Sequence, residues 1–206
     1  MANYAGGATV VGSLGQCGNA GVVHTYVAGG NLWPGDFVKM NGAVTVLNNG
    51  NNPINLKQVV SAADNSNEAY VGVVVGKVIS TSRSGASPSL DTPLSTAAPI
   101  ASGDIVMVAD DPSLLFSIPC TGTVTVANLG LNSQVDVPAT GSAGRSAMKV
   151  DSTYLNVGTN AATAPVRVLD IVNAPDNDGT GATSGTVVIV KINNHQMNPA
   201  TGVAGT

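Results

Sequence analysis

Charge is scarce in this sequence, and glutamate is nearly absent. The 206 residues include 8 Lys plus Arg and 12 Asp plus Glu, which gives a net charge of −4, and Glu68 is the single glutamate. Long surface helices depend on Glu, Lys, Arg and Gln, because these straight side chains lose little rotamer freedom in a helix. The four types together supply only 13 residues. An all-α bundle, a coiled coil and an ordinary doubly wound α/β enzyme are therefore disfavoured.

Basic residues are too few and too scattered for an anionic partner. The eight are spread from Lys39 to Lys191, whereas proteins that follow a nucleic-acid backbone or an anionic membrane cluster their Lys and Arg. We therefore expect no nucleic-acid partner and no membrane partner. Apolar runs of about 18 residues, which a membrane-spanning helix needs, are also missing. The first 18 residues lack the basic and apolar parts of a secretory signal, so we expect synthesis in the cytoplasm without export.

Histidine and cysteine are equally rare. His24 and His195 are the only histidines, and Cys17 and Cys120 lie 103 positions apart, so no zinc-ligand spacing is present. We interpret both histidines as structural and both cysteines as free thiols. A disulfide between the two cysteines stays open, because a sequence does not show whether their α-carbons approach.

Catalytic motifs are also missing. Asp110-Asp111 and the acidic stretch 176–179 lack the downstream glutamate of a calcium loop, and we interpret them as solvated turn residues. No dinucleotide fingerprint, phosphate-binding loop or nucleophile elbow occurs. We predict no catalytic residue, no cofactor and no metal. A β-barrel enzyme or a sugar-binding module is the minor alternative.

The abundant residues favour β-structure. Val (30), Gly (25), Ala (25), Asn (20), Thr (18) and Ser (17) dominate. Val and Thr fit pleated strands, and Gly and Asn fit tight turns. The prediction is an all-β fold, a β-sandwich or β-barrel with long loops, an extended N-terminal arm and little or no helix.

The chain divides by composition. Residues 1–20 are Gly- and Ala-rich and are predicted to be a flexible arm. Residues 21–197 form the β-rich domain, with two β-units at 21–79 and 100–197. They are joined by a loop at 80–99 that holds three Pro and six Ser. Residues 198–206 form a tail.

Several local patterns make sharper predictions. Asn41-Gly42 between apolar segments predicts a hairpin with a type I′ turn. Glycines within the apolar stretch 69–79 indicate a bulge or a tight barrel bend. Gly35-Asp36 and Gly103-Asp104 each precede an apolar residue and a valine, which we interpret as turn chemistry rather than as a repeat.

A series of blocks in the second half resembles the capsid decoration (cement) proteins of tailed bacteriophages. The first block runs from Val108 through Asp110-Asp111-Pro112 to Ile118, where a strand ends in an Asp-Asp-Pro turn and continues to a Phe-x-Ile strand. The later blocks follow in the same order, at 129–132, 140–146 with 151–152, 165–169 and 190–196. The resemblance covers residues 103–196 and, more loosely, 30–80.

The resemblance implies a β-rich protein bound in many copies to the outer surface of an icosahedral capsid in the virion. Its expected partners are the major capsid protein and itself, as a homotrimer. On this basis the candidate capsid contacts are Tyr4, Val10 and Val11 of the arm, and Trp33, for which core filling is the alternative role. Another β-rich virion component, such as a tail or fibre protein, is the alternative function.

Overall fold

The regular secondary structure of the protein is almost entirely β-strand. The computed structural model describes residues 7–14, 23–49, 52–63, 68–78, 99–138, 141, 144–156, 163–174, 177 and 185–197. Of these described residues, 52% are in strands and 5% in helices, so the all-β prediction is confirmed.

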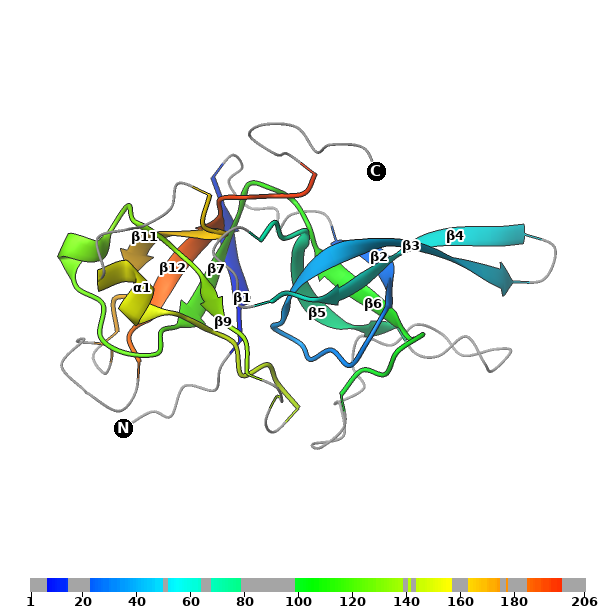
Figure 1. Ribbon diagram of the computed structural model, residues 1–206, viewed down its shortest axis with the longest axis horizontal. Coiled ribbons are helices and arrows are strands. Elements are labelled where there is room, and N and C mark those ends of the chain that lie inside the picture. Colours follow the sequence, from blue (N-terminus) through cyan, green and yellow to red (C-terminus); the bar gives the residue numbers. More distant parts are fainter. Residues whose placement is uncertain are drawn as a thin grey trace.

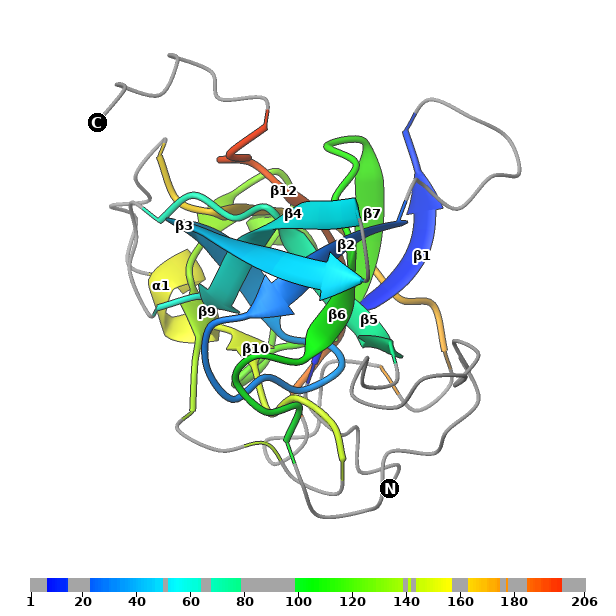
Figure 2. The same ribbon diagram turned by 90° about the vertical axis from the view of Figure 1, so that its right-hand side faces the viewer.

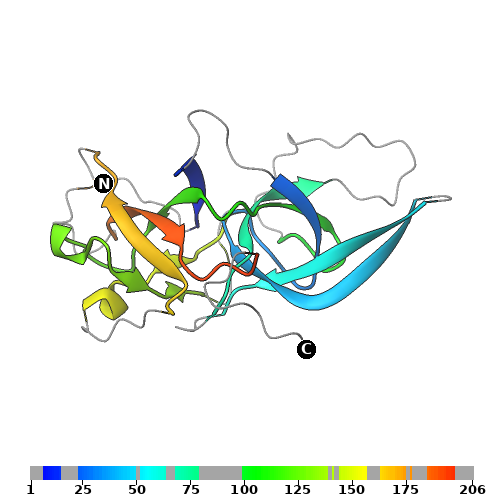
Figure 3. The ribbon, with the colours of Figure 1, turned by 90° about the horizontal axis from the view of Figure 1, so that it is seen from above.

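Five strands close into a barrel, which forms the right-hand half of Figure 1. They are β2 (Val23–Ala28), β3 (Phe37–Asn49), β4 (Asn52–Ser61), β5 (Gly72–Val78) and β6 (Ile105–Ala109), in the order β2-β4-β3-β5-β6. β2 closes the barrel by pairing with β6, and its pairing with β4 is the one parallel contact among these strands. The paired ends of β3 and β4 extend past the rest of the barrel, away from the other half of the molecule (Figure 3).

The other half, called the sheet unit here, is an open antiparallel sheet. Its strands are β1 (Thr9–Ser13), β7 (Leu114–Pro119), β12 (Val187–Ile192), β11 (Val166–Ile171) and β8 (Asn132–Ser133), in the order β1-β7-β12-β11-β8. β9 (Val135–Asp136) and β10 (Lys149–Val150) form a short ladder, and two small helices accompany them, η1 (Val126–Asn128) and α1 (Ser152–Asn156). β1 lies at one side of the molecule when it is seen from the barrel end (Figure 2).

β3, β5 and β6 each bury apolar residues on both faces. Val38, Val74 and Val108 belong to the cluster of side chains that fills the barrel. Their sequence neighbours Phe37, Val73 and Ala109 belong to the core of the sheet unit. Successive residues of a strand point to opposite faces, so one set of strands lines the barrel and also covers the sheet.

Three aromatic rings meet at this shared boundary. Phe37 of β3 stacks on Tyr70, with ring centroids 5.2 Å apart, and meets Phe116 of β7 edge-on at 5.7 Å. Phe37 and Phe116 are the only phenylalanines of the chain. Both separations lie in the favourable range for aromatic pairs, so the scarce aromatic area is concentrated where the barrel and the sheet unit join.

The predicted arm is wrong for residues 7–14. Residues 9–13 form β1, which pairs with β7 along the edge of the sheet, and Ala8 is buried in the core. The remainder of the predicted arm lies outside the described residues, as does most of the predicted loop at 80–99. Two β-units are present, but their boundary differs from the prediction. β6 of the second half completes the barrel, and β1 of the first 20 residues joins the sheet unit.

The predicted hairpin at Asn41-Gly42 is also wrong. β3 runs straight through this dipeptide, and the register against β4 shifts between Met40 and Val44. Gly42 has φ +81°, and the Asn41 side chain accepts a hydrogen bond from the Ala43 N–H at 3.0 Å. The positive-φ preference of Asn-Gly is therefore satisfied by a bulge inside the strand. The partner strand β4 had no counterpart in the sequence prediction.

The predictions for the two Gly-Asp turns and for the glycine bulge are confirmed. Gly35 and Gly103 have φ +93° and +89°, and each following aspartate accepts a hydrogen bond from a backbone N–H three residues earlier, at 2.7 and 3.0 Å. The two Gly-Asp pairs are thus the same turn used twice, which confirms the turn interpretation. The ladder between β5 and β6 shifts between Val74 and Gly76, which confirms the bulge.

Candidate functional site

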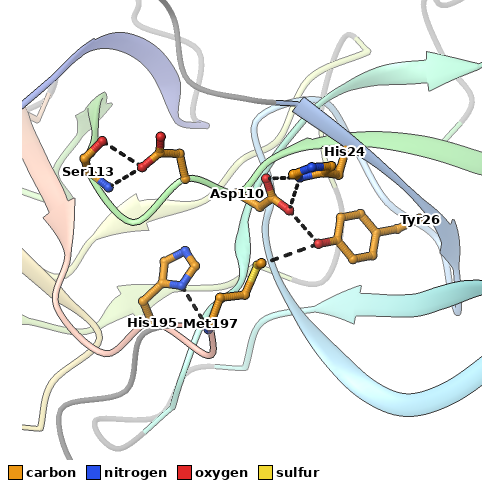
Figure 4. Close-up of polar contacts among 7 residues, drawn as sticks. His24, Tyr26, Asp110, Ser113, His195 and Met197 are labelled. Carbon is orange, nitrogen blue, oxygen red and sulfur yellow. Dashed lines mark hydrogen bonds and ion pairs between the residues drawn. The ribbon is translucent and has the colours of Figure 1, made fainter. Parts of the chain in front are cut away.

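A polar cluster lies where β2, the end of β6 and the chain after β12 meet (Figure 4). Asp110, whose side chain is 1% exposed, is its centre. His24 Nδ1 lies 2.8 and 2.9 Å from the two carboxylate oxygens, and the Tyr26 hydroxyl donates to one of them at 2.6 Å. An ionised carboxylate only accepts, so Nδ1 carries a proton and His24 turns Nε2 away from Asp110.

The second histidine lies beside this cluster on a different element. Residues 193–197, called the C-terminal strap here, leave β12 and cross to the barrel, where Tyr70 and His195 form a parallel bridge. His195 is 2% exposed, and its Nδ1 lies 3.1 Å from the backbone nitrogen of Met197. Met197 in turn places its sulfur 3.9 Å from the Tyr26 hydroxyl.

Burial shifts the pKa values of Tyr26 and His195 in this cluster. Desolvation and the Asp110 carboxylate raise the pKa of Tyr26 far above its usual range. Desolvation also lowers the pKa of His195, although Asp110 and Asp111 oppose this shift. Asp111 is more exposed, and hydrogen bonds from the side chain and backbone of Ser113 lower the pKa of its carboxyl.

The two acidic residues of the Asp-Asp-Pro turn therefore have different roles. Asp111 accepts hydrogen bonds from Ser113 within the turn, which agrees with its interpretation as a turn residue. The interpretation of Asp110 as a solvated turn residue is wrong, because it is buried and holds His24 and Tyr26. His24 and Asp110 are 86 positions apart, and a spacing of that size carries no signal in one sequence. The local sequence places His24 and Tyr26 two positions apart, and therefore on the same face of a strand, but it does not point to Asp110.

The cluster has part of the chemistry of a general base. A buried aspartate orients an imidazole, and the His24 side chain is 56% exposed, as in a catalytic dyad. Among the described residues, no hydroxyl or thiol is hydrogen-bonded to His24 Nε2, and no set of three His, Cys, Asp or Glu could hold a metal ion. Cys120 is a free, buried thiol, and burial raises its pKa to about 12. It therefore has little thiolate character.

The four predicted contact residues fall in different surroundings. Tyr4 lies outside the described residues. Val10 packs against the core of the sheet unit, which leaves little of its side chain for another protein. Val11 is 51% exposed. Trp33 is half-buried beside Gly141, where an added Cβ would come within 2.5 Å of the indole ring, so it belongs to neither buried core.

Two exposed apolar side chains lie at β1. Val11 lies in this strand, and Leu14, which directly follows it, is 59% exposed. β1 pairs with β7 on one side only and is an edge of the sheet within the described part of the chain. An edge strand offers unpaired backbone groups to another chain, so β1 and Leu14 form a candidate interaction surface.

None of the helices that the structure describes is long and apolar enough to cross a membrane. No protein-family model matches the sequence. A search of the curated proteins also finds no relative.

Proposed function

We propose that this chain is a structural virion protein that binds the outer surface of an icosahedral phage capsid. It stabilises the capsid by bridging neighbouring major capsid protein subunits. The ordered blocks in 103–196 carry this proposal. The arrangement that the resemblance implies for the first block is consistent with the fold: β6 ends at Ala109, the Asp-Asp-Pro turn follows, and β7 contains Phe116 and Ile118.

The β1 edge is the proposed contact with the capsid. An extended segment of the major capsid protein would add to this edge by backbone hydrogen bonds, and Val11 and Leu14 would contribute apolar contacts. Each contact can be weak, because many copies on one lattice bind with avidity. A protein that binds the assembled lattice and not free subunits stabilises the assembly by mass action.

Self-association is part of the proposal. A homotrimer would place three β1 edges on three neighbouring capsid subunits, and a net charge of only −4 per copy keeps repulsion among crowded copies small. Light scattering of the purified protein tests this point, since a mass of three chains is expected and a single-chain mass would contradict it.

The main test uses capsids that lack this protein, prepared from the phage that encodes it. Adding the purified chain should raise the temperature at which the capsids break, and the chain should sediment with them. Val11→Asp and Leu14→Asp should each weaken binding at least about tenfold, because a charge would be desolvated at an apolar contact. Val126→Asp is the matched control, since Val126 is 75% exposed on η1 and away from β1.

Deletion of residues 1–20 is a poor test, because it would remove β1 and part of the core. Point variants whose unfolding midpoint equals that of the wild type are needed. Failure of the wild-type chain to bind the capsids would reject the function. Binding that Val11→Asp and Val126→Asp weaken equally would reject only the β1 contact. Antibody labelling of the tail instead of the head would replace the proposal with a tail or fibre role.

A further inference from the structure

The C-terminal strap connects the sheet unit to the barrel by hydrogen bonds on both sides. It begins at Asn193, whose backbone N–H donates to the Pro165 carbonyl at 2.8 Å in the sheet unit. It then forms a two-way pairing on the barrel side, where the Tyr70 N–H donates to the Asn194 carbonyl at 3.0 Å and the Gln196 N–H donates to the Tyr70 carbonyl at 2.8 Å.

Side-chain hydrogen bonds also attach the strap to the barrel side. The Gln196 amide oxygen accepts from the Met40 N–H at 2.7 Å, and the Asn194 amide donates to the Glu68 carbonyl at 3.2 Å. The only glutamate of the chain therefore lies in the segment that receives the strap, where its carboxylate pairs with Lys39. This network spans β3, the segment before β5 and the end of β12.

His195 occupies the middle of the strap in a defined tautomer. A backbone N–H can only donate, so the contact between Met197 N–H and His195 Nδ1 requires a bare Nδ1. The neutral ring then carries its proton on Nε2, which is fully buried. A second proton on this ring must go to Nδ1, where it would face the Met197 N–H.

We propose that His195 is an acid-sensitive latch, and that protonation of Nδ1 releases the C-terminal strap from the barrel. The proton comes from solvent and the Met197 N–H···Nδ1 hydrogen bond is lost. Release frees the Tyr70 pairing and uncovers the boundary between the barrel and the sheet unit. This inference is independent of the proposed capsid partner.

The charged groups around His195 act in opposite directions. Asp110 and Asp111, from the connection between β6 and β7, favour the protonated ring, as do backbone groups of Val71 and Asp110. Asp110 is already shared between His24 and Tyr26 of β2, and Glu68 is paired with Lys39 of β3. Desolvation is the largest influence on His195 and lowers its pKa.

The sign of the pH effect follows from this direction. Because the folded pKa of His195 is lower than that of an unfolded histidine, about 6.5, the latch contributes its full stability above that pH. This contribution to stability is lost as the pH falls below the pKa of an unfolded histidine and through the lower pKa of His195 in the folded protein. Acid should therefore open the strap, while the barrel remains closed.

Hydrogen exchange of the full chain tests the latch. After correction for intrinsic exchange, protection of the Gln196 and Tyr70 amides should fall at least tenfold between about pH 7.5 and about pH 5. Amides of barrel strands such as Val106 and Val108 should keep their protection. Unchanged protection of the strap in the wild-type protein would overturn the proposal without any variant.

Two single variants assign the effect to the ring. His195→Asn keeps an acceptor near the position of Nδ1 but does not titrate, so its strap should stay protected at both pH values. His24→Asn removes the other histidine and should keep the wild-type pH response. Equal acid opening in His195→Asn, or loss of the response in His24→Asn, would overturn the proposal. Nitrogen chemical shifts give an independent check, since a proton on His195 Nδ1 at about pH 7.5 would also overturn it.

Discussion

The barrel and the sheet unit bury similar small apolar side chains but end their hydrogen-bonded ladders differently. In the barrel, β2 pairs with both β4 and β6, so the ladder closes on itself. In the sheet unit, the described strands leave β1 at one edge and the two-residue β8 at the other. Closure removes edges, whereas an open sheet keeps them available for partners. The closed barrel is thus suited to be a rigid support, and the open edge of the sheet unit is suited to bind a partner.

The barrel and the sheet unit also differ in how far the core of each depends on side chains from the other part. The cluster that fills the barrel draws only on the barrel strands and the loops between them. The core of the sheet unit includes Phe37, Val73 and Ala109 from the outer face of the barrel. The sheet unit therefore depends on barrel residues to complete its core, while the barrel is filled by its own strands and loops. Changes at their boundary should be costlier than changes inside the barrel.

Truncation of Phe37 should produce the largest effect. Phe37 is fully buried and contacts both Tyr70 and Phe116. Phe37→Ala should lower the free energy of unfolding by about 3–5 kcal/mol, because it removes a ring and leaves a cavity. Chemical denaturation followed by circular dichroism measures this loss.

Two other variants sharpen that result. Phe37→Leu keeps much of the apolar volume and should cost about 1–2 kcal/mol. Val106→Ala, inside the barrel, should cost about 2 kcal/mol. A Phe37→Ala loss no larger than that of Val106→Ala would show that the boundary is not the costlier region.

A methyl group added at Gly72 should come next in size. A Cβ at this position would lie 2.2 Å from the Ala109 carbonyl oxygen, which is a backbone atom and cannot rotate away as a side chain could. Gly72→Ala should therefore push β5 and β6 apart and cost roughly 1–3 kcal/mol. Thermal unfolding measures it against Gly30→Ala, where an added Cβ meets nothing within 4 Å. Equal thermal unfolding midpoints for the two variants would mean that β5 and β6 move apart at little cost, and would contradict this prediction.

Gly72 also illustrates how far the sequence could lead. Glycines inside this valine-rich strand correctly indicated a bulge, which lies at Gly76, because only local geometry is involved. The Gly-Asp turns were predictable for the same reason. Asn41-Gly42 misled, since a bulge and a type I′ turn both need positive φ, and the choice between them depends on how far β4 extends along β3.

Pairings between residues far apart in the sequence could not be predicted from local patterns. β1 looked like a loose arm because five residues of Thr, Val, Gly and Ser become a strand only when β7 offers its edge. Asp110 was interpreted as a turn residue because its partner His24 lies 86 positions earlier in the chain, beyond the reach of any local pattern. The Trp33 side chain likewise depends on Gly141, which follows more than a hundred residues later.

The smallest expected effect compares two bulges, one in each part of the molecule. Gly12 lies at the bulge of β1, where an added Cβ meets nothing within 4 Å, and Gly76 lies at the bulge of β5, where it would lie 3.2 Å from the Met107 methyl. Gly12→Ala should raise stability by up to about 1 kcal/mol, because alanine reduces the entropy of the unfolded chain. Gly76→Ala should gain less, since Met107 must move. Differential scanning calorimetry measures both, and a lower midpoint for Gly12→Ala than for Gly76→Ala would show that the β1 edge is packed more tightly than the barrel wall.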